Sequence, residues 1–212
     1  RPEGILFFSS SEIYGDPSES DIPTNEDYRG NVSCLGPRAC YDEAKRFGET
    51  LCWIYHDQFG LPVTIARPFN NFGPGMSLHD GRLPADLAKQ ILSTCDIEIF
   101  SDGTPTRAYC YVADAIVGYL SCLVHGKFDV FNIGSDSSET SVSEFASIFV
   151  EVARDLFGYE KDVVFKVSSD TAYLKDNPQR RCPDLRKARS MLSYDSRTGV
   201  KQGVERYLKH LA

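Results

Sequence analysis

Short apolar runs alternate along this chain with longer segments of helical pattern, and this alternation limits the folds that it can adopt. The runs at residues 4–8 and 62–66 are of buried-strand type, and a helix is expected between them over 38–59, with Pro37 ahead of it and Gly60 after it. Later strands are expected at 97–100, 130–133 and 163–167, and later helices at 82–94, 112–124, 143–157 (behind a capping box at 141–144), 183–192 and 200–211. The pattern predicts an α/β sheet with helices on its faces and a smaller appended lobe.

The composition is that of an ordinary globular protein. Of 212 residues 42% are apolar, and the net charge is -7 without a block of Lys or Arg, so neither nucleic acid nor an anionic membrane is expected as a partner. No run reaches the roughly 18 apolar residues of a membrane span, and residues 1–4 lack signal-peptide character, so a cytoplasmic location is expected. The seven cysteines and four histidines are scattered without zinc-site spacing, so reduced thiols and no metal are expected.

A tyrosine and a lysine stand at i and i+4 near the start of the expected 38–59 helix. At this spacing the Tyr41 phenol and the Lys45 ammonium lie one turn apart on the same face, so the cation can stabilise a phenolate beside it. Tyr41 is therefore a candidate general base near neutral pH. Upstream, the first apolar run ends in polar residues that include Ser10 and Glu12.

A glycine-rich turn after a strand is absent from these residues, since none follows the pattern G-x-G-x-x-G or G-x-x-G-x-x-G. If the chain belongs to a dinucleotide-binding fold, the first half of that fold is therefore expected outside these residues.

Four ordered motifs carry a resemblance to a known family. They are residues 9–15 (SSSEIYG), 36–45 (GPRACYDEAK), 67–74 (RPFNNFGP) and 106–112 (TRAYCYV). In this order they resemble extended short-chain dehydrogenases/reductases that act on nucleotide sugars, within which the chain is most similar to the UDP-glucuronate decarboxylases. The likeness runs from Gly4 to about Leu211 and includes residues 176–184. A lone Tyr-x-x-x-Lys is a weak signal, whereas four ordered motifs are strong.

The resemblance implies a fold and a division of the chain. The fold is a Rossmann-type doubly wound parallel sheet, of which these residues form the C-terminal half, with a smaller α/β lobe that binds the substrate. Within one unit over 1–212, residues 1–75 are expected to form the catalytic Rossmann portion. Residues 76–212 are expected to form mainly the nucleotide-sugar lobe, with return segments to the Rossmann core.

The resemblance also implies an assembly. In the family the helix that corresponds to 38–59 packs in a four-helix bundle between subunits. Here it carries Phe47, Leu51, Ile54 and Tyr55, which is more apolar surface than the side facing the sheet needs. A homodimer is therefore expected, with packing inside one subunit as the alternative.

The implied activity is NAD-dependent decarboxylation of UDP-glucuronate to UDP-xylose through a 4-keto intermediate. Tyr41 would remove the proton of the sugar 4-hydroxyl while hydride passes from C4 to NAD, and Lys45 would favour the phenolate and hydrogen-bond the nicotinamide ribose. Ser10 lies where the family keeps a Ser or Thr that hydrogen-bonds the sugar 4-oxygen. The ketone at C4 is β to the C5 carboxylate, which leaves as CO2 before the hydride returns.

Glu12 separates the reaction types within the family. The 4,6-dehydratases resemble residues 9–15 but carry an Asp-Glu acid and base, and here the first of those positions is Ser11, so dehydration lacks its proton donor. Simple 4-epimerases usually lack a carboxylate at the Glu12 position, whereas the decarboxylases have one. One position departs from the decarboxylases, which carry Arg after Gly-Pro where this chain has Gly75.

Two alternatives therefore stay open. One is an NAD-dependent nucleotide-sugar 4-epimerase or 4,6-dehydratase. The other, from a different class, is a non-catalytic fragment or pseudoenzyme that binds a nucleotide sugar or a partner subunit.

The remaining site residues come from the same likeness. Arg107 stands where the family has an arginine that contacts the substrate and assists protonation, and a guanidinium suits a diphosphate or carboxylate. The others are Arg181 for the diphosphate, Asn70 for the substrate, Asn71 and Arg82 for the cofactor side, and Phe100 as an aromatic near the nucleotide base.

The absent glycine motif leads to a prediction about cofactor affinity. Pyrophosphate binding in this fold depends on backbone N–H groups at a glycine turn that opens the first helix. The 212 residues alone should therefore bind NAD weakly or not at all. Isothermal titration calorimetry of the isolated chain tests this, and micromolar affinity would contradict it.

Overall fold

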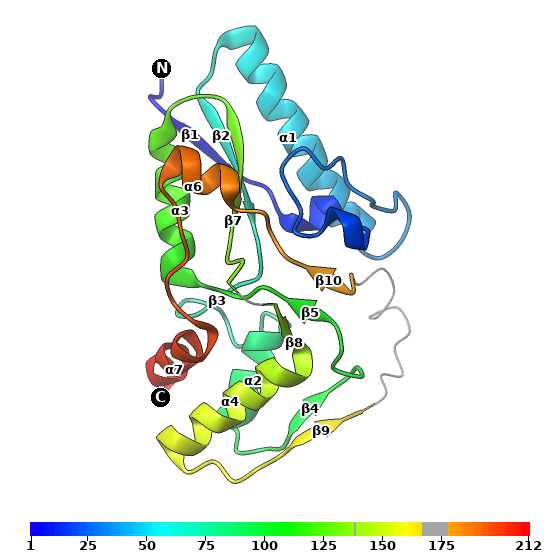
Figure 1. Cartoon of the computed structure of the whole chain (residues 1–212), viewed down its shortest axis with the longest axis vertical. Helices are drawn as coiled ribbons and strands as arrows, with labels where there is room; N and C mark the ends of the chain where they lie inside the picture. The colour runs from blue at the N-terminus through cyan, green and yellow to red at the C-terminus, as the bar shows by residue number, and fades with distance from the viewer. Residues whose placement is uncertain (138, 167–177) are drawn as a thin grey trace.

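The computed structural model describes residues 1–137, 139–166 and 178–212 (Figure 1). Its helices are α1 (Ala39–Phe59), α2 (Leu83–Leu92), α3 (Val112–His125), α4 (Val142–Phe157), α6 (Arg186–Leu192) and α7 (Val200–Leu211), with 3-10 turns η1 (Ser11–Tyr14) and η2 (Glu19–Asp21). Its longer strands are β1 (Ile5–Phe8), β2 (Val63–Pro68), β4 (Ile97–Ile99), β7 (Asp129–Ile133) and β9 (Val163–Phe165). These elements confirm the predicted alternation, although the last residue of the expected 163–167 strand lies outside the described residues.

Five two-residue strands were not predicted from the sequence. They are β3 (Asn71–Phe72), β5 (Thr106–Arg107), β6 (Cys110–Tyr111), β8 (Thr140–Ser141) and β10 (Arg180–Arg181). A two-residue strand shows no periodicity, so only its pairing partners define it. β3 pairs with β6 and β4 with β9, both parallel, while β5 lies between the parallel β10 and the antiparallel β8.

The main sheet is parallel, in the order β1-β2-β7. Phe8 stands opposite Ala66, and Ala66 stands opposite Phe131. Figure 1 shows α1 on one face of this sheet and α3 with α6 on the other. Parallel strands need such helical crossovers, and all of their carboxyl ends meet at one edge. The predicted α/β fold with a parallel sheet is confirmed, and the loop after β1 starts at that edge.

Close approach of helices to this sheet depends on two glycines. A Cβ on Gly48 of α1 would lie 2.3 Å from the Phe7 ring of β1, and a Cβ on Gly118 of α3 would lie 2.7 Å from Ile133 of β7. Both distances are shorter than atoms in contact allow, so a side chain at either position would push its helix outward. The two glycines thus set the thickness of the layers on opposite faces.

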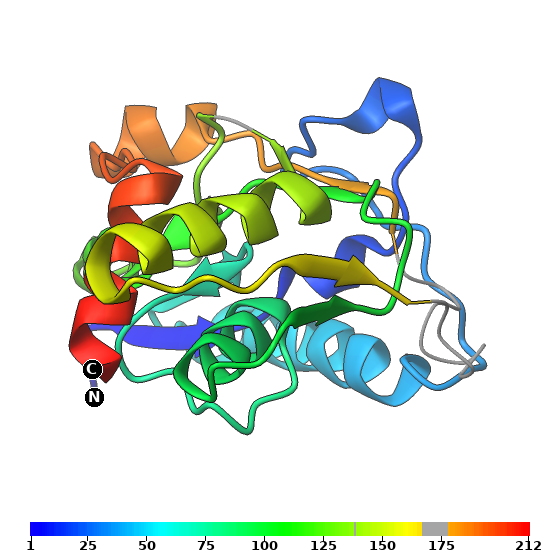
Figure 2. The ribbon, with the colours of Figure 1, turned by 90° about the horizontal axis from the view of Figure 1, so that it is seen from below.

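Two groups of buried apolar side chains fill the interior. The larger group, which includes Phe72, Phe145 and Tyr207, joins α2, α4 and α7, and Figure 2 shows α4 beside α2 and α7. The second group, which includes Phe131 and Tyr194, lies between the sheet and α3 with α6. The expected division between residues 75 and 76 stays a prediction.

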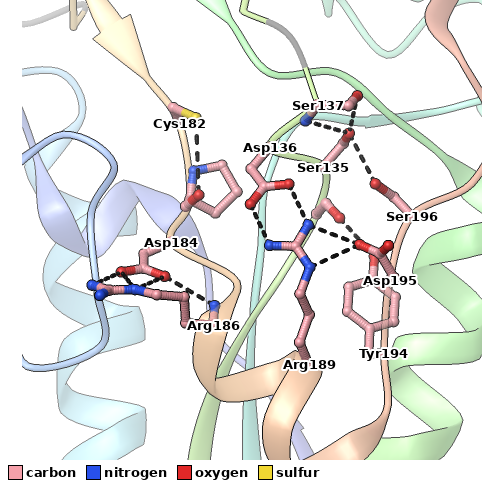
Figure 3. A network of polar contacts seen from close by, with 12 residues as sticks. Ser135, Asp136, Ser137, Cys182, Asp184, Arg186, Arg189, Tyr194, Asp195 and Ser196 are labelled. Atoms are coloured by element: carbon pink, nitrogen blue, oxygen red, sulfur yellow. Dashed lines mark hydrogen bonds and ion pairs between the residues drawn. The ribbon is translucent and has the colours of Figure 1, made fainter.

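The segment that contains α6 is fixed on the carboxyl end of β7. Figure 3 shows Arg189 between two carboxylates, and the ion pairs measure 2.6 Å to Asp136 and 2.8 Å to Asp195. The buried Tyr194 hydroxyl donates a hydrogen bond of 2.7 Å to the carbonyl of Gly134. The strand before α6, β10, pairs with β5 and lies near the site described below.

The helix predicted over 183–192 begins later than expected, at Arg186. Pro183 forms a parallel bridge with Thr24, and the N–H of Asp184 donates to the Thr24 carbonyl at 2.9 Å, so both residues are extended. The Asp184 carboxylate then accepts the N–H of Arg186 at 2.9 Å, which supports the first turn. By contrast, the capping box predicted ahead of α4 is confirmed.

A buried guanidinium joins the sheet to the loop and helix beside it. Arg67 of β2 donates to both carboxylate oxygens of Glu49 on α1, at 2.9 and 2.6 Å, and to the Tyr14 hydroxyl of η1 at 2.7 Å. Tyr14 in turn donates to Asn132 of β7 at 2.7 Å, and Arg67 also reaches the Glu26 carbonyl at 2.8 Å. We call this set the Arg67 network.

The sequence predicts neither a membrane span nor a metal site. Within residues 1–137, 139–166 and 178–212, no helix is long and apolar enough to cross a membrane. In the same residues no group of three or more His, Cys, Asp or Glu side chains could hold a metal ion. The cytoplasmic location stays a prediction.

Breaking the Arg67 network should strongly lower stability. The Glu49 and Arg67 side chains are only 13% and 10% exposed, so Glu49→Gln leaves a buried guanidinium without its counter-charge. We expect a loss of about 3 to 5 kcal/mol in the free energy of unfolding, measured by urea denaturation. Glu43→Gln on the same helix is the control, because its 3.9 Å pair with Arg46 is exposed and should contribute less than about 0.5 kcal/mol. Equal losses in the two variants would contradict the prediction.

Candidate active site

Tyr41 and Lys45 lie on the first turns of α1, beside the end of β1. The Lys45 Nζ donates a hydrogen bond of 2.9 Å to the carbonyl of Phe8, the last residue of β1, and lies 5.7 Å from the centroid of the Tyr41 ring. Tyr41 is 49% exposed. The structure therefore brings the predicted pair together, with an ammonium group near a phenol that a ligand can reach.

Ser10 and Glu12 lie where β1 leads into η1. The Ser10 Oγ accepts the N–H of Glu12 at 3.2 Å and caps the turn. The Glu12 carboxylate forms ion pairs with Arg38, just before α1, and with Arg181 on β10. One carboxylate thus joins three segments that are distant in the sequence, and we call Glu12, Arg38 and Arg181 the carboxylate clamp.

Opposing influences set the charge of Glu12. Burial alone would raise the pKa of this carboxyl, but the guanidinium groups of Arg181 and Arg38 together outweigh burial and hold the pKa below its usual range. Glu12 is therefore ionised at neutral pH. Asp42, which follows Tyr41, behaves differently, because burial and then the negative charge of Glu12 raise its pKa.

Arg107 extends the positive charge of this region. It stands opposite Arg181 in the pairing of β5 with β10, and its Nη1 donates to the Thr106 carbonyl at 2.8 Å. Burial and then the charge of Arg181 lower the pKa of Arg107 to about 10, so it stays protonated at neutral pH. Arg181 is 5% exposed, and its Nε has no hydrogen-bond partner among the described residues. Neighbouring guanidinium groups of this kind suit an anionic ligand.

The residues predicted for the cofactor side gather around Tyr119 of α3. The Asn71 Nδ2 donates to the Tyr119 hydroxyl, while the Asn71 Oδ1 is buried without a hydrogen-bond partner among the described residues. Arg82 lies close enough to lower the pKa of Tyr119, although burial, the largest influence, raises it. The Tyr119 ring packs edge-on against Phe8 at 4.8 Å between centroids, and the Phe8 carbonyl binds Lys45. These contacts link the cofactor side to the end of β1.

The two other predicted substrate contacts are Asn70 and Phe100. Asn70 adopts a φ of 42° in the turn between β2 and β3, and its Nδ2 donates to the Ala108 carbonyl at 3.4 Å. Phe100 follows β4 and is 48% exposed. Figure 1 places β4 at the end of the molecule opposite to β1, so the structure does not bring Phe100 next to Tyr41 or Glu12. The roles of Asn70 and Phe100 stay predictions.

Three residues of the site were not predicted from the sequence. Arg38 stands one turn before Tyr41, and this spacing could have placed it on the same side of the helix. Asp42 is only 7% exposed, and its Oδ1 has no hydrogen-bond partner among the described residues. Tyr119 lies 48 positions from Asn71, and no local pattern indicates that they meet.

A family model and several curated relatives match this chain. The model of the NAD dependent epimerase/dehydratase family matches residues 1–134. UDP-glucuronic acid decarboxylase 1 of Danio rerio is 35% identical over 98% of this chain and 47% of its own length. UDP-glucuronic acid decarboxylase 6 of Arabidopsis thaliana is 36% identical over 94% of this chain and 55% of its own length. The chain thus spans about half the length of the curated relatives it matches.

Solved structures show the same fold. UDP-glucose 4-epimerase of Thermotoga maritima, solved with UDP-glucose, superimposes with a TM-score of 0.82 at 23% identity, over 97% of this chain and 62% of that protein. UDP-glucuronic acid 4-epimerase of Bacillus cereus was solved with UDP-glucuronic acid and NAD. It superimposes with a TM-score of 0.69 at 26% identity, over 97% of this chain and 60% of that protein. These neighbours agree with the Rossmann-type fold expected from the sequence.

Proposed function

Since this chain belongs to the NAD-dependent epimerase/dehydratase family, we propose that the natural protein converts UDP-glucuronate to UDP-xylose and CO2 through a 4-keto intermediate. NAD, the cofactor expected from the sequence, is also the cofactor in the description of that family. The relatives at 35 and 36% identity are named as UDP-glucuronic acid decarboxylases, which supports this choice of reaction.

The charge of Glu12 is the observation that carries the proposal. An ionised carboxylate can accept a proton but cannot donate one, and two guanidinium groups keep Glu12 in that form. Dehydration needs an acid for its leaving group, and the position before Glu12 is Ser11. The two ion pairs of Glu12 therefore argue against dehydration, and the likeness to decarboxylases selects decarboxylation among the reactions that begin with oxidation at C4.

The residues at the end of β1 suit NAD. Lys45 and the exposed Tyr41 lie beside the carboxyl end of a parallel strand, which is where open α/β sheets bind nucleotides. The buried Asn71 Oδ1 has no hydrogen-bond partner among the described residues and can accept one from a ligand. Tyr41, Lys45, Asn71 and Arg82 would hold the cofactor. When bound, NAD takes the hydride from the sugar C4 and later returns it.

The first step assigned to this chain is removal of a proton. Tyr41, whose ring centroid lies 5.7 Å from the Lys45 Nζ, is assigned as the base that accepts the proton of the 4-hydroxyl. The Ser10 hydroxyl lies at the same strand end and hydrogen-bonds the 4-oxygen. Together these groups fix the oxygen from which the ketone forms.

Loss of CO2 follows from the position of that ketone. The bond between C5 and the carboxylate breaks, its electron pair delocalises into the ketone, and C5 then receives a proton. Arg107 and Arg181 stand opposite each other in the pairing of β5 with β10, and guanidinium groups suit the negative charges of the substrate. Arg107 assists protonation in this proposal, and Glu12 remains a carboxylate throughout.

A 4-epimerase is the second candidate. Gly75 stands where the decarboxylases carry an arginine, and a UDP-glucuronic acid 4-epimerase shares the fold at 26% identity. Both reactions begin with the same oxidation at C4. They differ in whether the carboxylate is retained.

Product analysis with the natural protein tests the function. Supplied with UDP-glucuronate and NAD, it should release one CO2 per UDP-pentose without net formation of NADH. UDP-galacturonate with its carboxylate intact would instead support the epimerase, and no conversion of the sugar would support the pseudoenzyme.

The role of Tyr41 is tested separately by substitution. Tyr41→Phe removes the group that accepts the 4-hydroxyl proton but keeps the ring, so kcat should fall by a factor of about 10² to 10⁴ while NAD and sugar still bind. Tyr159→Phe is the control, because Tyr159 packs in the larger apolar group away from the site, so loss of its hydroxyl should leave full activity. Full activity of Tyr41→Phe would show that the assignment of the base is wrong.

We also propose that the protein forms a homodimer through α1. Phe47, Leu51, Tyr55 and Phe59 follow one another at i, i+4 spacing and are 62%, 38%, 50% and 51% exposed. Asp42 is the only buried residue of this 21-residue helix. An apolar stripe that residues 1–137, 139–166 and 178–212 leave exposed suits a second copy of the same helix.

Sedimentation tests the dimer. Wild type at tens of micromolar should sediment as a dimer, and Phe47→Arg should shift it toward monomer because a charge in the stripe would be desolvated. Phe157→Arg on α4 is the control, since Phe157 is also exposed, at 43%, but lies on another helix. A wild-type monomer would count against the proposal.

A further inference from the structure

The two oxygens of the Glu12 carboxylate have different partners. Oε1 binds Nη1 of Arg181, and Oε2 binds Nη2 of Arg38. The side chains are 6% exposed for Arg181, 19% for Glu12 and 36% for Arg38. The carboxylate clamp is therefore asymmetric, with a buried arm on β10 and a more accessible arm at the start of α1.

The accessible arm is connected to the helix that carries the proposed base. The Arg38 carbonyl accepts the N–H of Tyr41 at 3.0 Å and the N–H of Asp42 at 3.2 Å. The same residue thus holds the first turn of α1 through its backbone and Glu12 through its side chain. Because Glu12 lies on η1, the ion pair joins η1 directly to the turn that carries Tyr41.

We propose that Arg38 is a positioning residue, which holds Glu12 ionised and fixes it relative to Tyr41. This inference rests on the proposed function, in which Glu12 acts as a carboxylate. Arg38 itself transfers no proton and need not touch the substrate. Its effect is on the charge and the orientation of Glu12, so its loss should be visible in the pH dependence of the reaction.

The groups that face Glu12 determine the direction of that effect. Arg181 faces it from β10, Arg107 from β5, and Arg38 and the buried Asp42 from α1. Burial raises the pKa of Glu12, and Arg181 with Arg38 reverses this. Without Arg38 the burial remains and only Arg181 opposes it, so the pKa of Glu12 rises and Glu12 becomes protonated at higher pH than in the wild type.

Direct titration of the Glu12 carboxyl group tests the effect of Arg38 on its charge and needs no measurement of enzyme activity. Glutamate carboxyl groups labelled with carbon-13 are followed by NMR, and the signal of Glu12 is identified by its loss in Glu12→Gln. Arg38→Ala should move the titration midpoint of Glu12 to higher pH, and Arg38→Lys should move it less. An unchanged midpoint in Arg38→Ala would overturn the proposal.

Arg46→Ala is the matched control. Arg46 also binds the turn that carries Glu12, but through the backbone, since it donates to the carbonyls of Ile13 at 3.1 Å and Arg29 at 2.9 Å. Its loss can loosen the same turn without removing a counter-charge from Glu12. The Glu12 midpoint should therefore stay in place in Arg46→Ala, and an equal shift there would show that the effect of Arg38 is only structural.

Kinetics with the natural protein test the consequence for the reaction. In Arg38→Ala, kcat for CO2 release should fall about 10- to 100-fold near neutral pH, and its acidic limb should move to higher pH, so that part of the rate returns as pH rises. Arg38→Lys, or free guanidinium added to Arg38→Ala, should restore part of the loss. A uniform fall at every pH, without rescue, would overturn the positioning role.

A double variant separates this proposal from the function itself. If Arg38 acts through Glu12, then Arg38→Ala should add less than about threefold to the loss already caused by Glu12→Gln. If the activity losses of Arg38→Ala and Glu12→Gln multiplied in the double variant, the proposal would be overturned. Failure of the wild type to release CO2 from UDP-glucuronate would instead overturn the decarboxylase function, and the NMR titration would still decide whether Arg38 controls the charge of Glu12.

Discussion

The buried guanidinium of Arg67 determines where the elements of the site stand relative to the sheet. It belongs to β2, yet its hydrogen bonds reach Glu49 on α1 and the Tyr14 hydroxyl on η1. Glu12 lies on that same η1, and Tyr41 lies on that same α1. Because each of these bonds has a fixed direction, the Arg67 network aligns the two elements before any ligand is present. The network thus acts on the geometry of the site without touching its reactive groups.

A second polar cluster depends on that alignment. The carboxylate clamp can form only if η1, the start of α1 and β10 meet, and Glu12 is separated from Arg181 by 169 positions. Removing a charge from water is costly unless an opposite charge compensates it. A clamp that lacked Arg38 or Arg181 would leave the buried Glu12 carboxylate with only one counter-charge. A buried ion pair adds little net stability, because the cost of removing both charges from water offsets their attraction. The fold therefore specifies the ionised state of Glu12 together with its position.

The sequence predicted which residues of one helix or loop belong to the site, but it did not predict the contacts between distant segments. Tyr41 and Lys45 share one helix, so their spacing alone was enough to place them together. The contacts of Glu12 with Arg181 and of Arg67 with Glu49 connect distant segments, and no local pattern records which arginine meets which carboxylate. For the same reason the longer strands and helices of the described residues were expected, whereas the two-residue strands were not, since they exist only through their partners.

Helix α1 combines two properties that bear on how the site is controlled. Its first turns carry Tyr41 and Lys45, but its only buried residue is Asp42, so little apolar packing within the chain holds it in place. Its position relies on directional polar contacts, such as those of Lys45 with the Phe8 carbonyl and of Glu49 with Arg67. Polar contacts fix angles well, but the apolar stripe on the opposite side stays in water unless another surface covers it. Since Tyr41 stands on the same helix, a second copy that covered the stripe would also act on the position of the proposed base.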